Sequence, residues 1–243
     1  MELLDRYRHV LDRLNTACAA AGRAREDVTL IAVSKLHPAE EVAVVAAAGQ
    51  VDFGENYVQE ALQKREDLAA SAGSSTLAAG IRWHMIGHVQ SRKAAQVGGA
   101  FALIHTLDSR KLADGLEKRM SGAEERQPVL FEINIASEPQ KSGLMPADLP
   151  ALADYVLENC PHLDIQGLMC LPPVFDAGDA ARPHFAHLRQ LRDSLQKHTG
   201  LPLPTLSMGM SGDFEAAVAE GATLVRIGTD IFGPRSAKTP PLA

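Results

Sequence analysis

Short apolar segments alternate with longer amphipathic segments along most of the chain, and this alternation limits the fold more than any other feature. Eight segments are rich in aliphatic and β-branched residues, and each precedes a helical pattern opened by a polar residue or glycine. We place strands near residues 28–34, 51–53, 81–86, 103–106, 129–134, 165–170, 205–207 and 223–227. This pattern predicts an α/β fold, a closed (β/α)8 barrel of TIM type, with an open doubly wound sheet as the alternative.

The first strand and its neighbours illustrate the repeating unit. Residues 28–34 form a nearly continuous hydrophobic run, which is typical of a parallel strand buried on both faces. Pro38 stands where the first turn of a helix tolerates proline, and Gly49 ends the helix predicted over residues 39–48. An apolar stripe between Leu3 and Cys18 predicts an extra amphipathic helix before the first strand. No GxGxxG motif follows that strand, so the sequence does not indicate a dinucleotide site.

The chain of 243 residues, 46% of them hydrophobic, is long enough to bury one large core. Residues 1–235 are predicted to form a single barrel domain without an interdomain linker or a second β-domain. Residues 236–243 contain Pro240-Pro241 and are predicted to be a flexible C-terminal tail.

Charge and composition exclude several classes of partner. The net charge of −6, with scattered basic residues, argues against nucleic acid and against an anionic membrane. No apolar run approaches the roughly 20 residues of a membrane helix, and residues 1–6 do not resemble a signal peptide, so we expect a cytoplasmic protein. Cys18, Cys160 and Cys170 lack CxxC spacing, and we predict that all three are core residues.

Lys35 directly follows the first predicted strand. In this type of barrel, functional residues gather at the C-terminal ends of the strands. A lysine there can be a solvated charge, but partial burial in the barrel mouth would lower its pKa from about 10.4 and supply the neutral amine that a Schiff base requires.

Two turns near the end of the chain have the small residues of a phosphate site. Residues 207–213, which include Ser211, follow the seventh strand, and Gly228-Thr229 follows the eighth. Loops after strands seven and eight commonly bind phosphate in such barrels, because helix N-termini favour an anion. Helix capping by Ser211 and Thr229 is the alternative. Together with Lys35, these turns indicate the two anchors of a phosphorylated aldehyde.

Two further polar residues lie at strand ends. Arg226 precedes Gly228 by two residues on the last strand, so strand alternation points both the same way. An unpaired arginine in an apolar strand is costly, and we favour a ligand contact over a purely structural role. Asn56 follows the second strand and could cap a helix or contact a ligand. His84 and His88 do not share a helical face, so no metal site is predicted.

An ordered set of motifs resembles a known family. The motifs lie between Val28 and Arg235 and read Ala32-Val33-Ser34-Lys35, Phe53-Gly54-Glu55-Asn56-Tyr57-Val58-Gln59-Glu60, Trp83-His84-Met85-Ile86-Gly87, Lys141-Ser142-Gly143, Gly167-Leu168-Met169, Ser207-Met208-Gly209-Met210-Ser211 and Val225-Arg226-Ile227-Gly228-Thr229-Asp230-Ile231-Phe232-Gly233. They resemble the pyridoxal phosphate homeostasis proteins of YggS or PROSC type. The chain departs from the usual family pattern at Val89 and Arg92, which replace a leucine and an asparagine.

The resemblance implies a barrel related to the N-terminal domain of alanine racemase, usually monomeric, that binds pyridoxal 5′-phosphate (PLP). It implies that Lys35 holds the cofactor as an internal aldimine. It further implies that Ser211, Gly228 and Thr229 bind the phosphate, that Arg226 faces the pyridine nitrogen and that Asn56 lines the ring. The function implied is vitamin B6 homeostasis, meaning storage, sequestration and delivery of PLP to apoenzymes, with no catalytic residues.

The alternatives are a racemase-like PLP enzyme and a cofactor-free barrel aldolase. Racemisation needs a proton donor opposite the lysine, which racemising relatives supply as a tyrosine from a second domain. This chain ends soon after the phosphate turns, and only Tyr57 of its three tyrosines is expected near the rim. Arginine beside the pyridine nitrogen also weakens the ring as an electron sink. Lys141 follows the fifth strand and could be a second amine used in transfer, or a solvated loop lysine.

Overall fold

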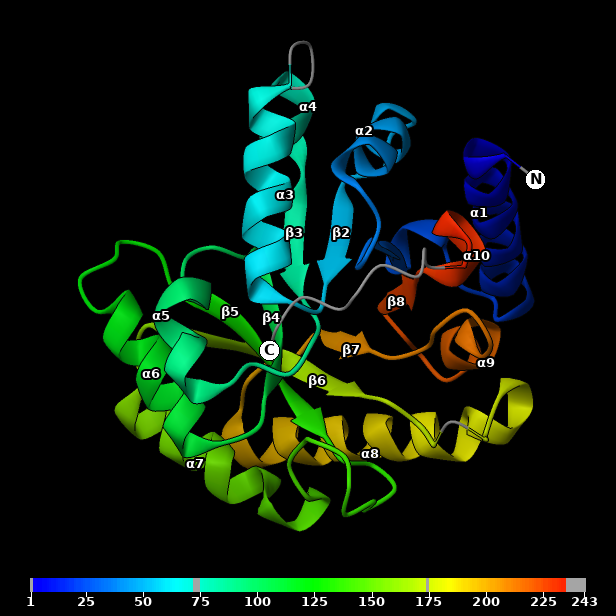
Figure 1. Ribbon diagram of the computed structural model, residues 1–243. Helices are drawn as coiled ribbons and strands as arrows, with labels where there is room; N and C mark the ends of the chain where they lie inside the picture. Colours follow the sequence, from blue (N-terminus) through cyan, green and yellow to red (C-terminus); the bar gives the residue numbers. More distant parts are fainter. Residues whose placement is uncertain (1, 72–74, 174, 235–243) are drawn as a thin grey trace.

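Eight parallel strands pair in chain order and close into a barrel, because β1 pairs with β8 (Figure 1). The computed structural model describes residues 2–71, 75–173 and 175–234. The strands are β1 (Thr29–Val33), β2 (Asp52–Glu55), β3 (Arg82–Met85), β4 (Leu103–Leu107), β5 (Gln127–Ile133), β6 (Leu163–Cys170), β7 (Thr205–Ser207) and β8 (Leu224–Ile227). The barrel and all eight predicted strands are therefore confirmed, and the open sheet is wrong.

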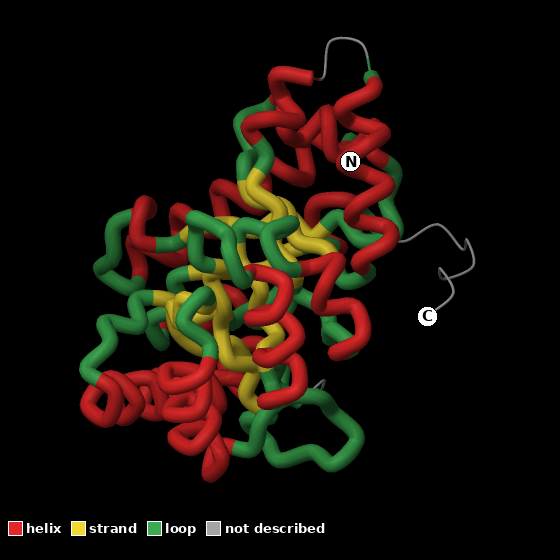
Figure 2. Tube along the Cα trace, turned by 90° about the vertical axis from the view of Figure 1, so that its left-hand side faces the viewer, coloured by secondary structure: helices red, strands yellow, loops and turns green. Residues whose placement is uncertain are grey.

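Helices surround the strands on the outside of the barrel (Figure 2). They are α1 (Leu3–Ala20), α2 (Ala39–Ala47), α3 (Val58–Ala70), α4 (Ser75–Gly80), α5 (Ala94–Val97), α6 (Arg110–Met120), α7 (Leu149–Asn159), α8 (Arg182–Thr199), α9 (Phe214–Ala219) and α10 (Thr229–Phe232). Helix α1 is the predicted extra N-terminal helix. The tail predicted over residues 236–243 lies outside the described residues. In the part of the chain that is described, no helix has both the length and the apolar character of a membrane span.

The core has two parts, which follow from the alternation of side chains along the strands. The larger part fills the space between barrel and helices and includes Phe53, Phe131 and Leu206. The smaller part lies inside the barrel and consists of Leu103, Leu130 and Met169. All three cysteines are buried and carry free thiols, as predicted, and burial raises the pKa of Cys170 to about 12.

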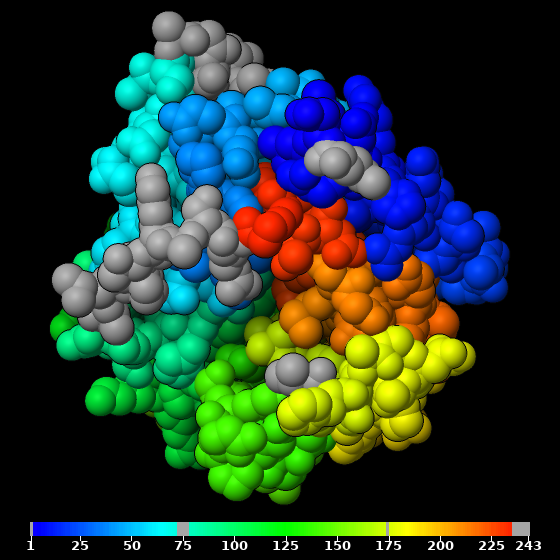
Figure 3. Space-filling model, turned by 45° about the vertical axis from the view of Figure 1, so that its right-hand side comes forward, coloured from blue at the N-terminus to red at the C-terminus, as the bar shows by residue number. Residues whose placement is uncertain are grey.

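Helix α1 joins the start of the chain to the last two described helices. It packs against α9 and α10, and Figure 3 shows the blue start of the chain beside the orange and red segments. Arg6 donates from Nε to the Ile231 carbonyl at 2.8 Å and from Nη2 to the Phe232 carbonyl at 3.0 Å, and these carbonyls close helix α10. Arg13 pairs with Asp230 at 2.6 Å. The extra helix therefore fixes α10, which begins directly after the Gly228 turn.

Gly167 allows β6 and β7 to approach each other. Its φ of +150° lies in a region that favours glycine, and a Cβ placed there would come within 1.9 Å of the Thr205 carbonyl oxygen. The register of β5 against β6 also shifts next to this residue, between Val129 and Leu130. The close approach is needed to bring the short strand β7 into the closed sheet.

Replacing Gly167 by alanine is therefore expected to destabilise the barrel. We expect a loss of roughly 3 kcal/mol in the free energy of unfolding, which lowers Tm by roughly 6–12 °C. Thermal unfolding followed by circular dichroism measures this. Gly80→Ala is the control, because among the described residues no atom beyond its chain neighbours and its own helix backbone lies within 4 Å of the added Cβ. Equal Tm values for the two variants would show that the close approach does not limit stability.

Candidate functional site

One cavity of about 300 Å³ lies at the C-terminal end of the barrel and contains every site residue predicted from the sequence. Its lining residues are Val33, Lys35, His37, Asn56, Ile86, Leu171, Met210, Ser211, Gly212, Arg226, Gly228, Thr229 and Gly233. Val33 and Arg226 belong to β1 and β8, and the others come from the segments that follow β1, β2, β3, β6, β7 and β8. A volume of this size is at the lower end of the range for small-molecule sites in proteins.

The backbone around Lys35 is held by a buried group of charges from β2 and α3. Ser34 donates to Glu55 at 2.6 Å, and the Leu36 amide donates to Glu60 at 2.5 Å. Lys64 donates to the Ser34 carbonyl at 2.8 Å, to Glu55 at 2.5 Å and to Glu60 at 3.1 Å. The residues on both sides of Lys35 are thus anchored. Lys35 itself is half-buried, in keeping with the expected rim lysine.

This arrangement combines a strained backbone with a buried ion pair. Leu36 has a φ of +63°, which costs a non-glycine residue on the order of 1–2 kcal/mol. Burial raises the pKa of Glu55 against the lowering effect of Lys64. Breaking such a buried pair costs more than forming it gains, since the remaining charge is left in a low-dielectric environment. The strained turn therefore depends on Lys64.

The two predicted turns lie on the cavity wall. After β7, the Met210 amide donates to Asp213 Oδ1 at 2.6 Å, and Gly209 has a φ of +92°. After β8, a Cβ on Gly228 would come within 3.1 Å of the Val33 carbonyl oxygen, so the turn packs closely on β1.

Helix capping does not explain Ser211 and Thr229. The N-cap residues of α9 and α10 are Asp213 and Gly228, and neither helix has a side-chain cap hydrogen bond. The capping alternative left open by the sequence is therefore wrong for both hydroxyl residues. Both hydroxyl residues lie on the cavity wall instead.

Arg226 is buried beneath the cavity and makes two hydrogen bonds inside the barrel. Its Nη1 donates to Ser207 Oγ at 2.6 Å, and its Nη2 donates to the Cys170 carbonyl at 3.0 Å. Burial lowers its pKa, and the nearby Cys170, Asp213 and Glu132 oppose that effect. The Arg226 side chain thus makes structural hydrogen bonds and also lines the cavity. The structural role and the ligand contact considered from the sequence are therefore compatible.

Asn56 contributes a polar atom without a partner. Its Oδ1 is buried and accepts no hydrogen bond from the described residues. A Cβ on Gly87 would come within 2.3 Å of the Asn56 carbonyl oxygen, so the loop after β3 packs directly on this residue. A buried, unsatisfied amide oxygen at a cavity wall is typical of a ligand contact.

Sequence reasoning missed His37 among the lining residues. Its imidazole pairs with Glu41 at 3.0 Å and packs on the Phe232 ring at 5.1 Å. The position two residues after Lys35 was the available signal. His37 therefore adds an imidazole to the cavity wall besides the Lys35 amine.

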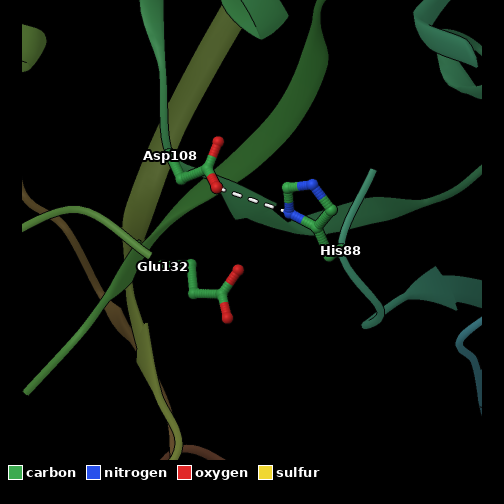
Figure 4. Close-up of side chains that lie close together, drawn as sticks. All are labelled: His88, Asp108 and Glu132. Atoms are coloured by element: carbon green, nitrogen blue, oxygen red, sulfur yellow. Dashed lines mark ion pairs between the residues drawn. The ribbon is translucent and has the colours of Figure 1, made fainter. Parts of the chain in front are cut away.

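The two histidines considered for a metal lie apart. His84 points into the barrel, whereas His88 pairs with Asp108 at 3.4 Å on the rim, beside Glu132 (Figure 4). Potential ligand atoms of these last three residues lie within 4.8 Å of one another. Burial raises the pKa of Glu132, and the Asp108 charge adds to the effect. No local sequence pattern indicates this cluster, because the ends of three separate strands bring it together.

Lys141 is not a free loop lysine. It forms an ion pair with Glu138 and donates to the Pro172 carbonyl at 3.1 Å. It lines a neighbouring cavity of about 280 Å³, which shares Leu171 with the main cavity.

The atypical loop residues Val89 and Arg92 line neither cavity, since Val89 is in the core and Arg92 bonds to Gln90.

None of the three tyrosines lines the main cavity. Tyr7 is buried and donates to Gln50 at 3.2 Å, and Tyr155 donates to Asp114 at 2.6 Å. Tyr57 precedes α3 and is 38% exposed. The described part of the chain therefore offers no tyrosine as a proton donor at this cavity.

Comparisons with known proteins show the family to which the chain belongs. The family model described as the N-terminal domain of alanine racemase matches residues 4–236. A pyridoxal phosphate homeostasis protein of Aquifex aeolicus is 41% identical over 235 residues, covering 97% of this chain and 99% of that protein. A protein of the same name from Pseudomonas aeruginosa is 42% identical, with 95% of each chain covered.

Solved structures give the same result. PipY of Synechococcus elongatus is 35% identical; its PLP-free structure has a TM-score of 0.81 and covers 96% of this chain and all of that one. Its PLP-bound structure has a TM-score of 0.77, with 90% of this chain and all of that one covered. By sequence, by length and by fold, this chain belongs to the family of pyridoxal phosphate homeostasis proteins, whose barrel is that of the alanine racemase N-terminal domain.

Proposed function

We propose that this protein binds PLP on Lys35 and serves in vitamin B6 homeostasis, by storing and sequestering the cofactor and delivering it to apoenzymes. One observation carries the proposal: an amine, two hydroxyl-bearing turns, an arginine and an unsatisfied amide line a single cavity. The relatives are named for pyridoxal phosphate homeostasis, and PipY has been solved with PLP bound.

The residues present fit the cofactor at both ends. PLP supplies an aldehyde, which condenses with an amine to form a C=N bond and release one water. Lys35 would provide that amine, and Ser211, Gly228 and Thr229, which line the same cavity, would hold the phosphate. Asn56 Oδ1, buried without a partner, would gain a polar contact with the ring substituents.

Arg226 would face the pyridine nitrogen, and this would favour storage and delivery of the cofactor over catalysis. A guanidinium remains protonated and cannot accept a proton, so the ring nitrogen would stay unprotonated beside it. An unprotonated ring withdraws electrons less strongly and stabilises carbanions less well. Delivery would need no such stabilisation, because exchange of one lysine amine for another would form no carbanion and would leave Lys35 as the free amine.

The second candidate function is a racemase-like PLP enzyme, and His37 is the observation that favours it. Its imidazole lies on the cavity wall and could move a proton. Alanine racemase of Clostridium difficile has the same fold, with a TM-score of 0.69 at 15% identity, but this chain covers only 56% of that chain. Assays of racemisation across the amino acids decide between the two, since substantial turnover that His37→Ala abolishes would establish the enzyme.

Compartment and partners complete the proposal. A cytoplasmic monomer that contacts apoenzymes only transiently would suit a carrier, because delivery requires release. Size-exclusion chromatography with light scattering tests the monomer, and cell fractionation tests the compartment.

Replacing Lys35 by alanine is expected to abolish covalent PLP binding completely. The wild type mixed with PLP should absorb visible light, and borohydride reduction should leave the cofactor on the peptide that contains Lys35. Lys35→Ala should remain colourless. Lys93→Ala is the control, because this neighbouring rim lysine bonds to Gln59 and does not line the cavity. A wild type that stays colourless with PLP would reject the function.

Replacing Lys141 by alanine tests whether a second amine takes part in delivery. We expect PLP binding at Lys35 to be unchanged and the transfer of PLP to an apoenzyme to slow several-fold. Stopped-flow activation of the apoenzyme measures the rate, with Lys93→Ala again as the control. A transfer rate equal to that of wild type would remove Lys141 from the path.

A further inference from the structure

Five hydrogen-bonded side chains form a continuous row, here called the file, which crosses the inside of the barrel and ends at Arg226. Asp52 Oδ1 lies 2.9 Å from His84 Nε2, and His84 Nδ1 lies 3.0 Å from His105 Nε2. His105 Nδ1 lies 2.9 Å from Ser207 Oγ, which accepts the Arg226 hydrogen bond at 2.6 Å. The five residues come from β2, β3, β4, β7 and β8 and are separated widely in the sequence.

The file joins the two ends of the barrel. Its Asp52 end opens into a cleft of about 310 Å³ lined by residues at or near the starts of strands, including Thr29 and Thr205. Arg82 lies in the same cleft, 60% exposed, and its Nη2 donates to Asp52 Oδ2 at 2.7 Å. Its other end is the PLP cavity proposed above. The histidines between them are buried, His105 completely so.

When both imidazole rings are neutral, the two ends of the file assign the direction of every hydrogen bond in it. Burial opposes ionisation of Asp52, but hydrogen bonds from His84 and Arg82 outweigh it and lower the pKa of Asp52, so Asp52 is an acceptor. The proton of a neutral His84 is then on Nε2, and its Nδ1 accepts from His105 Nε2. Complete burial lowers the pKa of His105 well below its ordinary value, so this ring is neutral and its Nδ1 also accepts.

Ser207 consequently has one donor and one acceptor contact in the file. Its hydroxyl donates to His105 Nδ1, and its oxygen accepts from Arg226 Nη1. All donors point from Arg226 towards Asp52, so the bond dipoles lie head to tail between a buried positive charge and a negative one. Such chains polarise one another, and each bond is stronger than it would be alone.

We propose that Asp52, His84 and His105 are positioning residues for Arg226. Through Ser207 they fix the orientation of its guanidinium, so that it can face the ring of PLP. The inference rests on the proposed function. Cys170, Asp213 and Glu132 also lie near Arg226, but among the described residues its guanidinium donates to Ser207 Oγ and to the Cys170 backbone carbonyl rather than to these three side chains. Ser207 is therefore the side chain that fixes its Nη1.

Asp52→Asn tests the inference at the end farthest from the cavity. Asp52 Oδ1 lies 2.9 Å from His84 Nε2 and accepts from Arg82 Nε at 2.8 Å, and Oδ2 accepts from Arg82 Nη2 at 2.7 Å. In this variant the amide nitrogen must face one of the Arg82 donors, and the file loses the negative charge at its end, so its hold on Ser207 and Arg226 weakens. The control is Arg82→Gln, which removes the neighbouring charge but leaves the carboxylate and its bond to His84.

The measurements are the Kd for PLP and the pH midpoint of the visible absorbance of the loaded protein. For Asp52→Asn we expect Kd to rise about tenfold, equivalent to about 1.4 kcal/mol, and the pH midpoint to shift. For Arg82→Gln we expect both to stay close to wild type. A purely structural role for Asp52 would lower Tm without moving the pH midpoint of the bound chromophore.

A second pair of variants covers the case in which Asp52→Asn does not fold. Ser207→Ala should weaken PLP binding and shift the pH midpoint, and Ser207→Thr, which keeps the hydroxyl, should restore both. Folded Asp52→Asn with wild-type Kd and midpoint, or Ser207→Thr that behaves as Ser207→Ala, would overturn the inference. Failure of wild type to bind PLP would instead reject the proposed function.

Discussion

The pairing of β1 with β8 is the constraint on which the site depends. It places Ile31 opposite Arg226 and Ala32 opposite Ile227. The residues that follow these strands, Lys35 on one side and the Gly228 turn on the other, therefore meet at one end of the barrel. An open sheet made from the same strands would separate them. Helix α1 reinforces the closure, because Arg6 and Arg13 bind the segment that follows β8.

Buried charge organises the interior on both sides of β1. Lys64 and Glu55 hold the turn that carries Lys35, outside the barrel wall, while the file from Asp52 to Arg226 runs inside it. Buried ionic groups stabilise a fold poorly, because desolvation offsets their attraction. Their presence at two places around one cavity is best understood as positioning: each fixes a side chain or a turn that a ligand would contact.

Much of the fold and of the site was predictable from the sequence. Near-continuous apolar runs such as residues 28–34 identified the strands, since a parallel strand is buried on both faces. Lys35, Arg226 and the Gly228 turn could be assigned to the same rim because strand alternation and strand polarity are local properties. Helix capping by Ser211 and Thr229 was predicted as an alternative and was wrong, since Asp213 and Gly228 occupy those positions.

The sequence by itself determined the number of strands, the direction of each and the residues at their C-terminal ends, because these depend on periodicity along the chain. Only the tertiary structure decided which residues pair across the barrel. His105 and Ser207 are 102 positions apart, and His88, Asp108 and Glu132 come from three strand ends. No local pattern encodes such contacts, because they arise from the closure of the sheet, which brings inward-facing side chains of distant strands within hydrogen-bonding distance.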